Sequence, residues 1–81
     1  MLEKITNYIR NDEFSISIWN NKINLLNFKK IIILTEEKII VSFKDEIVTI
    51  KGENLSIKKL LEKEILVTGK INTIELGEQH V

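Results

Sequence analysis

The sequence predicts a single all-β domain, an antiparallel meander of about eight short strands that forms a small sandwich or roll. Three observations favour this fold class. From residue 14 onward, apolar residues such as Phe14, Ile16 and Ile18 alternate with polar ones, which is the period of a strand with one buried face. β-Branched residues, which suit a pleated surface, dominate the same stretch. Turn signals recur at short distances and leave no room for crossover helices.

The predicted strands lie between turn signals made of asparagine, glycine and charged residues. In chain order they are expected at residues 14–19, 22–26, 30–34, 38–43, 47–51, 55–61, 64–68 and 71–76. Gly52 and Gly69 each separate two alternating apolar runs, so each is expected to supply a positive-φ turn or a bulge. Close approach of a partner's backbone is the functional alternative at these two positions.

The first residues are expected to form a short helical arm. Leu2, Ile5 and Ile9 recur at spacings that place them on one face of a helix. This face either covers an edge of the domain or contacts a partner or a membrane surface. The predicted organisation is an N-terminal arm, a single β domain and a C-terminal tail, at residues 1–12, 13–78 and 79–81.

A weak 17-residue period leaves a second architecture open. Stepping by 17 aligns Ile23 with Ile40, Ile57 and Ile74, and two further columns are also apolar. A short β-solenoid with one such unit per coil would show the same period. Solenoids usually carry more glycine and asparagine at their corners, so the folded meander is preferred.

The residue inventory argues against an enzyme. The chain has no cysteine, and its one histidine, His80, lies beyond the last predicted strand. Neither a cysteine-based nor a histidine-based catalytic set is therefore expected. Carboxylates cluster in predicted turns, as at Glu36 and Glu37, where solvated hairpin tips are expected. We expect no enzymatic activity, no cofactor, no metal site and no small-molecule substrate.

The charge balance argues against nucleic acid as a partner. Twelve basic and twelve acidic residues cancel, whereas nucleic-acid binders usually show a basic excess. A small nucleic-acid-binding β-barrel is kept as the alternative function. The longest apolar run, residues 31–34, is too short to span a bilayer, and the chain does not open on a secretory signal. A cytoplasmic location is expected.

Trp19 is the candidate interface residue within the β domain. It ends the first predicted strand out of phase with Ile16 and Ile18, so it is expected on the opposite face. Tryptophan is enriched at interface hot spots. The alternative is that Trp19 closes one end of the core. Leu2, Ile5 and Ile9 of the arm complete the candidate interface.

Two segments in the second half of the chain carry a recognisable pattern. They read IVTIKGENLSI at residues 47–57 and EILVTGKI at residues 64–71, and Ile74-Glu75-Leu76 closes the pattern. With these segments, residues 22–76 resemble the YabP/YqfC family of sporulation proteins, and look closer to its YqfC branch. The signature positions that carry over are Gly52, Asn54, Leu55 and Gly69. The N-terminal arm departs from the family pattern, because it is shorter and less basic.

The resemblance implies a small β-rich protein made during endospore formation, with no enzymatic activity. YqfC-like members are paired with a larger membrane protein, so the implied partner is an integral membrane sporulation protein. The implied location is the mother-cell side of the cytoplasm, held at a membrane through that partner. We therefore expect a non-enzymatic interaction or structural module. It would dock to the membrane partner or form a homo-oligomer through strand edges that an open meander leaves unpaired.

Overall fold

The computed structural model describes residues 7–10, 15–19 and 21–78, and this part of the chain is all-β, with no helix. The strand predictions at residues 22–26 and 30–34 are confirmed, and those at 14–19 and 38–43 are confirmed to within a residue or two. The strands are β1 Asn7–Arg10, β2 Ser15–Ile18, β3 Lys22–Leu26, β4 Lys30–Leu34, β5 Lys38–Ser42, β6 Glu46–Leu60 and β7 Glu64–Glu78.

All seven strands belong to one antiparallel sheet with the order β1-β2-β3-β7-β6-β5-β4. Two meanders, β1 to β3 and β4 to β7, are joined by the pairing of β3 with the first part of β7. A simple meander would have placed β4 beside β3, so the predicted topology is correct within each meander and wrong at their junction. β1 and β4 end the order without pairing to each other, and the sheet is therefore open.

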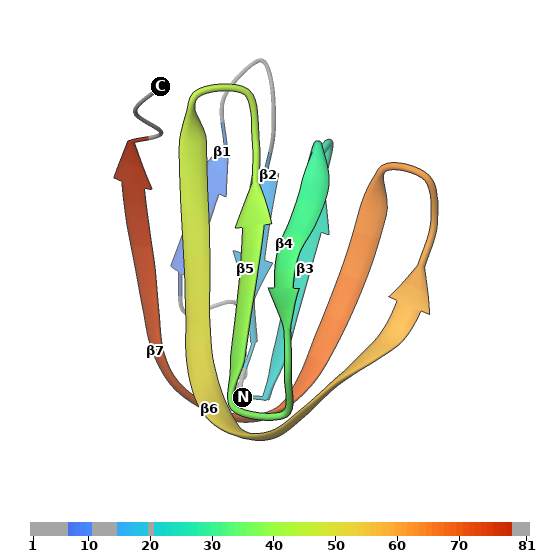
Figure 1. Cartoon of the computed structure of the whole chain (residues 1–81), viewed down its shortest axis with the longest axis vertical. Coiled ribbons are helices and arrows are strands. Elements are labelled where there is room, and N and C mark those ends of the chain that lie inside the picture. Colours follow the sequence, from blue (N-terminus) through green and yellow to red (C-terminus); the bar gives the residue numbers. More distant parts are fainter. Residues whose placement is uncertain (1–6, 11–14, 20, 79–81) are drawn as a thin grey trace.

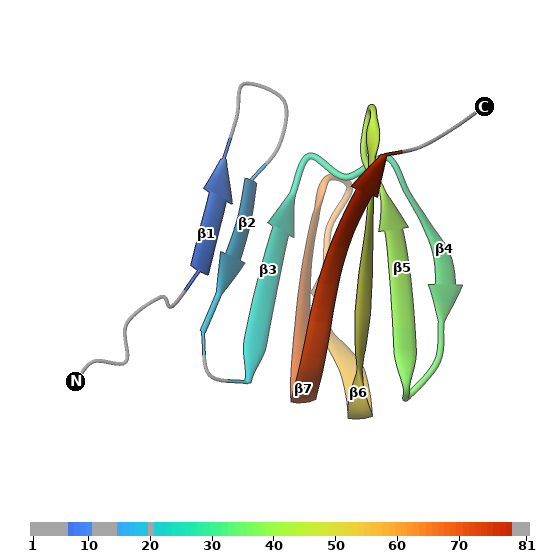
Figure 2. The same cartoon turned by 90° about the vertical axis from the view of Figure 1, so that its left-hand side faces the viewer.

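The two longest strands bend the sheet back on itself (Figure 1). β6 and β7 each contain 15 residues and pair with each other from end to end. The pairing of β5 with β6 covers only the first part of β6, and the pairing of β3 with β7 covers only the first part of β7. The bend thus divides the sheet into one half that contains β3 and another that contains β5, as Figures 1 and 2 both show. A continuous bent sheet matches the predicted roll better than a sandwich of separate sheets.

Apolar residues on the inner faces of the two halves form the core. β3 buries Ile23 and Leu25, and β5 buries Ile39 and Val41, as the period of two predicts for half-buried strands. The buried apolar residues are Ile16, Ile18, Ile23, Leu25, Phe28, Ile39, Val41, Phe43, Val48, Ile50, Leu55, Ile65 and Val67.

Three sequence predictions of architecture are wrong. The four strands predicted at residues 47–51, 55–61, 64–68 and 71–76 are two, because β6 and β7 continue through Gly52 and Gly69. The bulge expected as the alternative to a turn is present at this place, and Gly69 has the expected positive φ. Residues 7–10 of the predicted helical arm form β1, paired with β2; the rest of the arm, with Leu2 and Ile5, lies outside the described residues, as does the tail at 79–81. The solenoid alternative also fails, because every strand pair is antiparallel, whereas solenoid coils stack in parallel.

Candidate functional site

Gly52 and Gly69 lie at the bend because two backbones cross there almost in contact. A Cβ atom built on Gly52 would overlap the carbonyl oxygen of Lys70. A Cβ atom on Gly69 would lie 2.6 Å from the carbonyl oxygen of Asn54, and Gly69 also has a φ of +133°. Both glycines are thus required by close approach, but the approaching backbone belongs to this chain and not to a partner.

A bulge opposite Gly69 turns β6 through the bend. Glu53 pairs with Lys70 and Ser56 with Thr68, so Asn54 and Leu55 together face the single residue Gly69. Such two-against-one pairing bends a strand and increases its twist. Asn54 has a φ of 54°, in the left-handed region that asparagine tolerates better than most residues. Leu55 points inward and is 3% exposed.

The turn between β4 and β5 is hydrogen-bonded to the same bend. The amide of Gly52 donates to the carbonyl of Glu37 at 3.1 Å, and the amide of Leu55 donates to the carbonyl of Glu36 at 2.8 Å. The four signature positions, Gly52, Asn54, Leu55 and Gly69, therefore meet in one place. These residues hold β6 and β7 at the bend and, through the hydrogen bonds to Glu36 and Glu37, fix the place where β4 ends and the turn to β5 begins.

Trp19 lines a shallow hollow of about 580 Å³ on the outer face of the half that contains β3. The strand alternation that buries Ile23 and Leu25 turns Lys22 and Asn24 outward into this hollow. Trp19 directly follows β2 and is half-buried, and its amide donates to the carbonyl of Lys22 at 2.8 Å. Its position on the face opposite the core is the one predicted from its phase.

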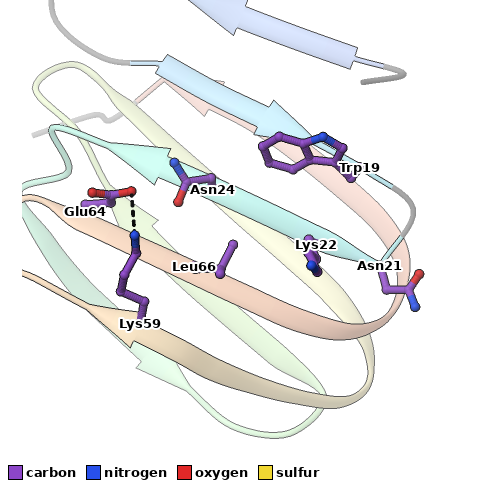
Figure 3. A pocket seen from close by; sticks show the side chains of 7 residues that line it. All are labelled: Trp19, Asn21, Lys22, Asn24, Lys59, Glu64 and Leu66. Carbon is purple, nitrogen blue, oxygen red and sulfur yellow. Dashed lines mark ion pairs between the residues drawn. The ribbon is translucent and has the colours of Figure 1, made fainter. Parts of the chain in front are cut away.

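The walls of the hollow are mixed in polarity. Figure 3 shows Trp19 on one side, Leu66 in the middle and the ion pair of Lys59 with Glu64 on the other side. This ion pair measures 3.5 Å between Nζ and Oε2. The described residues contain no group of three or more histidine, cysteine, aspartate or glutamate side chains placed to hold a metal ion. The hollow offers a tryptophan face and mixed charge, which suits contact with a surface more than chemistry on a bound molecule.

The outer edge of β4 is the second candidate, and it combines unpaired backbone with apolar side chains. Ile32, Ile33 and Leu34 are 44%, 38% and 53% exposed. The amide of Thr35 donates to the carbonyl of Lys38, the first residue of β5, at 2.9 Å, so the backbone groups of Thr35 face β5. Because backbone groups alternate along an antiparallel strand, those of Ile33 face β5 and those of Leu34 face outward. Exposed edge groups of this kind are templates for an added strand.

The sequence predicted only part of this arrangement. Trp19 and the signature positions were singled out, and Ile9 lies in β1, but the exposure of β4 was missed. One signal was present in the run Ile31 to Leu34, which is apolar without alternation. In an antiparallel strand with one solvated face, such a run must expose some of its apolar side chains.

None of the described residues lies in a helix with the length and apolar character needed to cross a membrane. Among curated proteins and solved structures, no match to the chain was found. The model of the YabP family matches residues 10–81, which includes the whole bend and the segments on which the resemblance rests. The chain belongs to the YabP family.

Proposed function

We propose that this chain is a non-enzymatic, sporulation-associated interaction module that acts through an exposed strand edge. Membership of the YabP family suggests a sporulation-related protein. The observation that supports the mode of action is β4, which ends the sheet with three exposed apolar side chains, Ile32, Ile33 and Leu34. Strand addition to such an edge supplies backbone hydrogen bonds for affinity and side-chain contacts for specificity.

The carboxylates of the described residues support a contact role over a catalytic one. Glu36, Glu37 and Asp45 are exposed in connections between strands. Glu64, the carboxylate in the hollow, is paired with Lys59. A general acid or base needs a closed site that holds it against its substrate, and both locations are open to solvent.

The partner that we propose is an integral membrane protein of the same developmental stage, contacted from the mother-cell cytoplasm. This part of the proposal follows from the resemblance of residues 47–57 and 64–71 to the YqfC branch. A membrane partner would place the chain at a membrane surface. Trp19 and the surrounding hollow are a second contact area on the same molecule.

A proline in the edge of β4 tests the proposal. Leu34→Pro removes an outward backbone donor without changing charge or a hydrogen bond to β5. The control Leu34→Val keeps both the donor and an apolar side chain. We expect Leu34→Pro to lose the membrane protein that the wild type retrieves from sporulating cells and to lower the yield of heat-resistant spores. Leu34→Val should behave as wild type, and circular dichroism should show both variants folded.

The proposal is wrong if folded Leu34→Pro protein, present at wild-type abundance, retrieves the same proteins and supports the same spore yield as wild type. A catalytic role would show itself differently. Spore yield would then depend on a polar side chain that is distant from β4, and it would be unaffected by the proline.

A further inference from the structure

We propose that the occupant of the β4 edge is a second copy of this chain, paired antiparallel with β4 about a two-fold axis, and that the membrane partner binds the resulting dimer. This inference rests on the proposed function, which uses the β4 edge, and it names the strand that pairs with that edge. Pairing in this way would join two seven-stranded sheets into one continuous sheet. The interface would be isologous, with the same surface contributed by both copies.

The backbone of β4 is free to accept this neighbour. β4 lies at one end of the strand order and pairs with β5 alone, and Figure 2 shows no strand on the side of β4 that faces away from β5. The outward groups of Leu34 continue the alternation set by Thr35 and Lys38. They can therefore donate to and accept from an antiparallel copy.

Charge complementarity selects the antiparallel copy. Lys29 and Lys30 precede or begin the strand, and Glu36 and Glu37 follow it. All four are exposed, and none has an ion pair with another described residue. Glu36 and Glu37 form the turn after β4, so an antiparallel copy centred on Ile33 brings the lysine end of each β4 toward the glutamate turn of the other, twice over by symmetry. Opposite charges across a strand pair stabilise it, and like charges destabilise it.

The acidic end of this pattern is held in place. The carbonyls of Glu36 and Glu37 accept hydrogen bonds from Leu55 and Gly52 at the bend. The two carboxylates therefore project from a backbone that these hydrogen bonds hold in place. This lowers the entropic cost of aligning them with the lysines of a second copy.

The apolar side chains of β4 would be covered by the same register. Ile33 lies opposite its own symmetry mate, and Ile32 lies opposite Leu34 of the second copy. A register shift between Ile31 and Ile33 makes Ile32 a bulge, and bulges commonly restrict edge pairing. The proposed pairing therefore depends on the outward backbone groups of Leu34, which lie beyond this bulge.

The edge formed by the last part of β6 does not offer this complementarity. Residues 56–60 pair with β7 on one side only, so this segment is also an edge. It carries Lys58 and Lys59, and an antiparallel copy centred on Lys58 would bring like charges together. Lysine at such a position is a common protection against edge pairing. Of these two edges, β4 is the one favoured for a second copy.

Reversing the charge at either end of β4 tests this pairing, because a variant with the lysine reversed and a variant with the glutamate reversed should restore the dimer when mixed. The oligomeric state of the purified full chain is measured by analytical ultracentrifugation over a wide concentration range. We expect wild type to show a concentration-dependent dimer. Lys30→Glu and Glu36→Lys should each weaken it by about tenfold or more, because two attractive pairs become repulsive. An equimolar mixture of the two variants should form a heterodimer near wild-type strength.

The controls separate this pairing from other modes of association. Lys58→Glu reverses an exposed charge on a different edge and should leave the dimer unchanged, whereas Leu34→Pro should abolish it. A wild type that stays monomeric at the highest soluble concentration would overturn the inference, as would a dimer that neither reversal weakens or a mixture that does not recover. A monomeric wild type whose Leu34→Pro variant still loses its membrane partner in cells would reject the second copy but keep the proposed function.

Discussion

At the residue scale, both glycines at the bend are required by the close approach of two backbones, and Gly69 also by its positive φ. Each glycine was expected to supply a positive-φ turn or a bulge; Gly69 has a positive φ, and Gly52 lies at a register shift instead. The spacing of apolar runs marked both glycines correctly as special. It could not show why, because the atoms that exclude a side chain at Gly52 come from Lys70, distant along the chain.

Alanine substitutions test this role directly. Gly52→Ala and Gly69→Ala should each lower the free energy of unfolding by about 1–3 kcal/mol, since each added methyl meets a backbone carbonyl. Gly77→Ala is the matched control, because nothing lies within 4 Å of its Cβ position, and it should be near neutral. Urea unfolding of the three variants measures the differences.

The same contact changes what asparagine should do at position 52. A left-handed turn would accept Gly52→Asn more readily than Gly52→Val. At a site of steric contact, asparagine gives no relief, and both variants should be destabilised. Melting curves in which Gly52→Ala equals the wild type would show that the backbones at the bend separate without cost.

At the element scale, local signals located the strands better than they located the reversals. A Gly-Glu-Asn sequence marks a departure from a straight strand, but a hairpin and a bend share that signal. What separates them is the partner strand. Gly52 pairs with Ile71, and the ladder resumes at Ser56 with Thr68, so β6 and β7 stay paired through the bend. That pairing is a long-range property that no window around Gly52 contains.

β1 offers a prediction at this scale. Its pairing comprises four residue pairs with β2, and the described core residues lie between β2 and β7. Deleting residues 1–10 should therefore lower the melting temperature by about 5–10 °C, as expected for a loss of 1–2 kcal/mol in a domain this small. The fold should survive. Differential scanning calorimetry and circular dichroism of the truncated chain would test this expectation, and loss of all β structure would contradict it.

At the scale of the whole molecule, one pairing decides the architecture. The contact of β3 with β7 brings Lys22 beside Thr68 and Leu26 beside Glu64, and it closes the two halves over the core. Composition and periodicity predicted the all-β class, because both can be read from the sequence without knowing which strands pair. The β3–β7 pairing is a long-range contact that the alternation of apolar residues does not encode. The hollow beside Trp19 and the exposure of β4 both depend on it.

The distribution of charge and aromatic side chains leads to the last prediction, that the protein has no substantial affinity for single-stranded nucleic acid. Non-specific binders gain most of their affinity by neutralising phosphates, and the net charge of this chain is zero. Stacking also requires exposed aromatics, yet Phe28 and Phe43 are buried. Trp19 is half-buried in the hollow, where Glu64 balances Lys59.

Fluorescence anisotropy with labelled single-stranded DNA and RNA should therefore give dissociation constants weaker than about 100 μM near physiological salt, the weak limit of non-specific binding. The variant Glu64→Gln removes the balancing charge in the hollow and gives a sensitive control. If the hollow were a nucleic-acid site, this variant would bind more tightly and Trp19→Ala would abolish binding. Micromolar wild-type affinity that falls steeply with salt, together with those two responses, would replace the strand-edge role with nucleic-acid binding at Trp19.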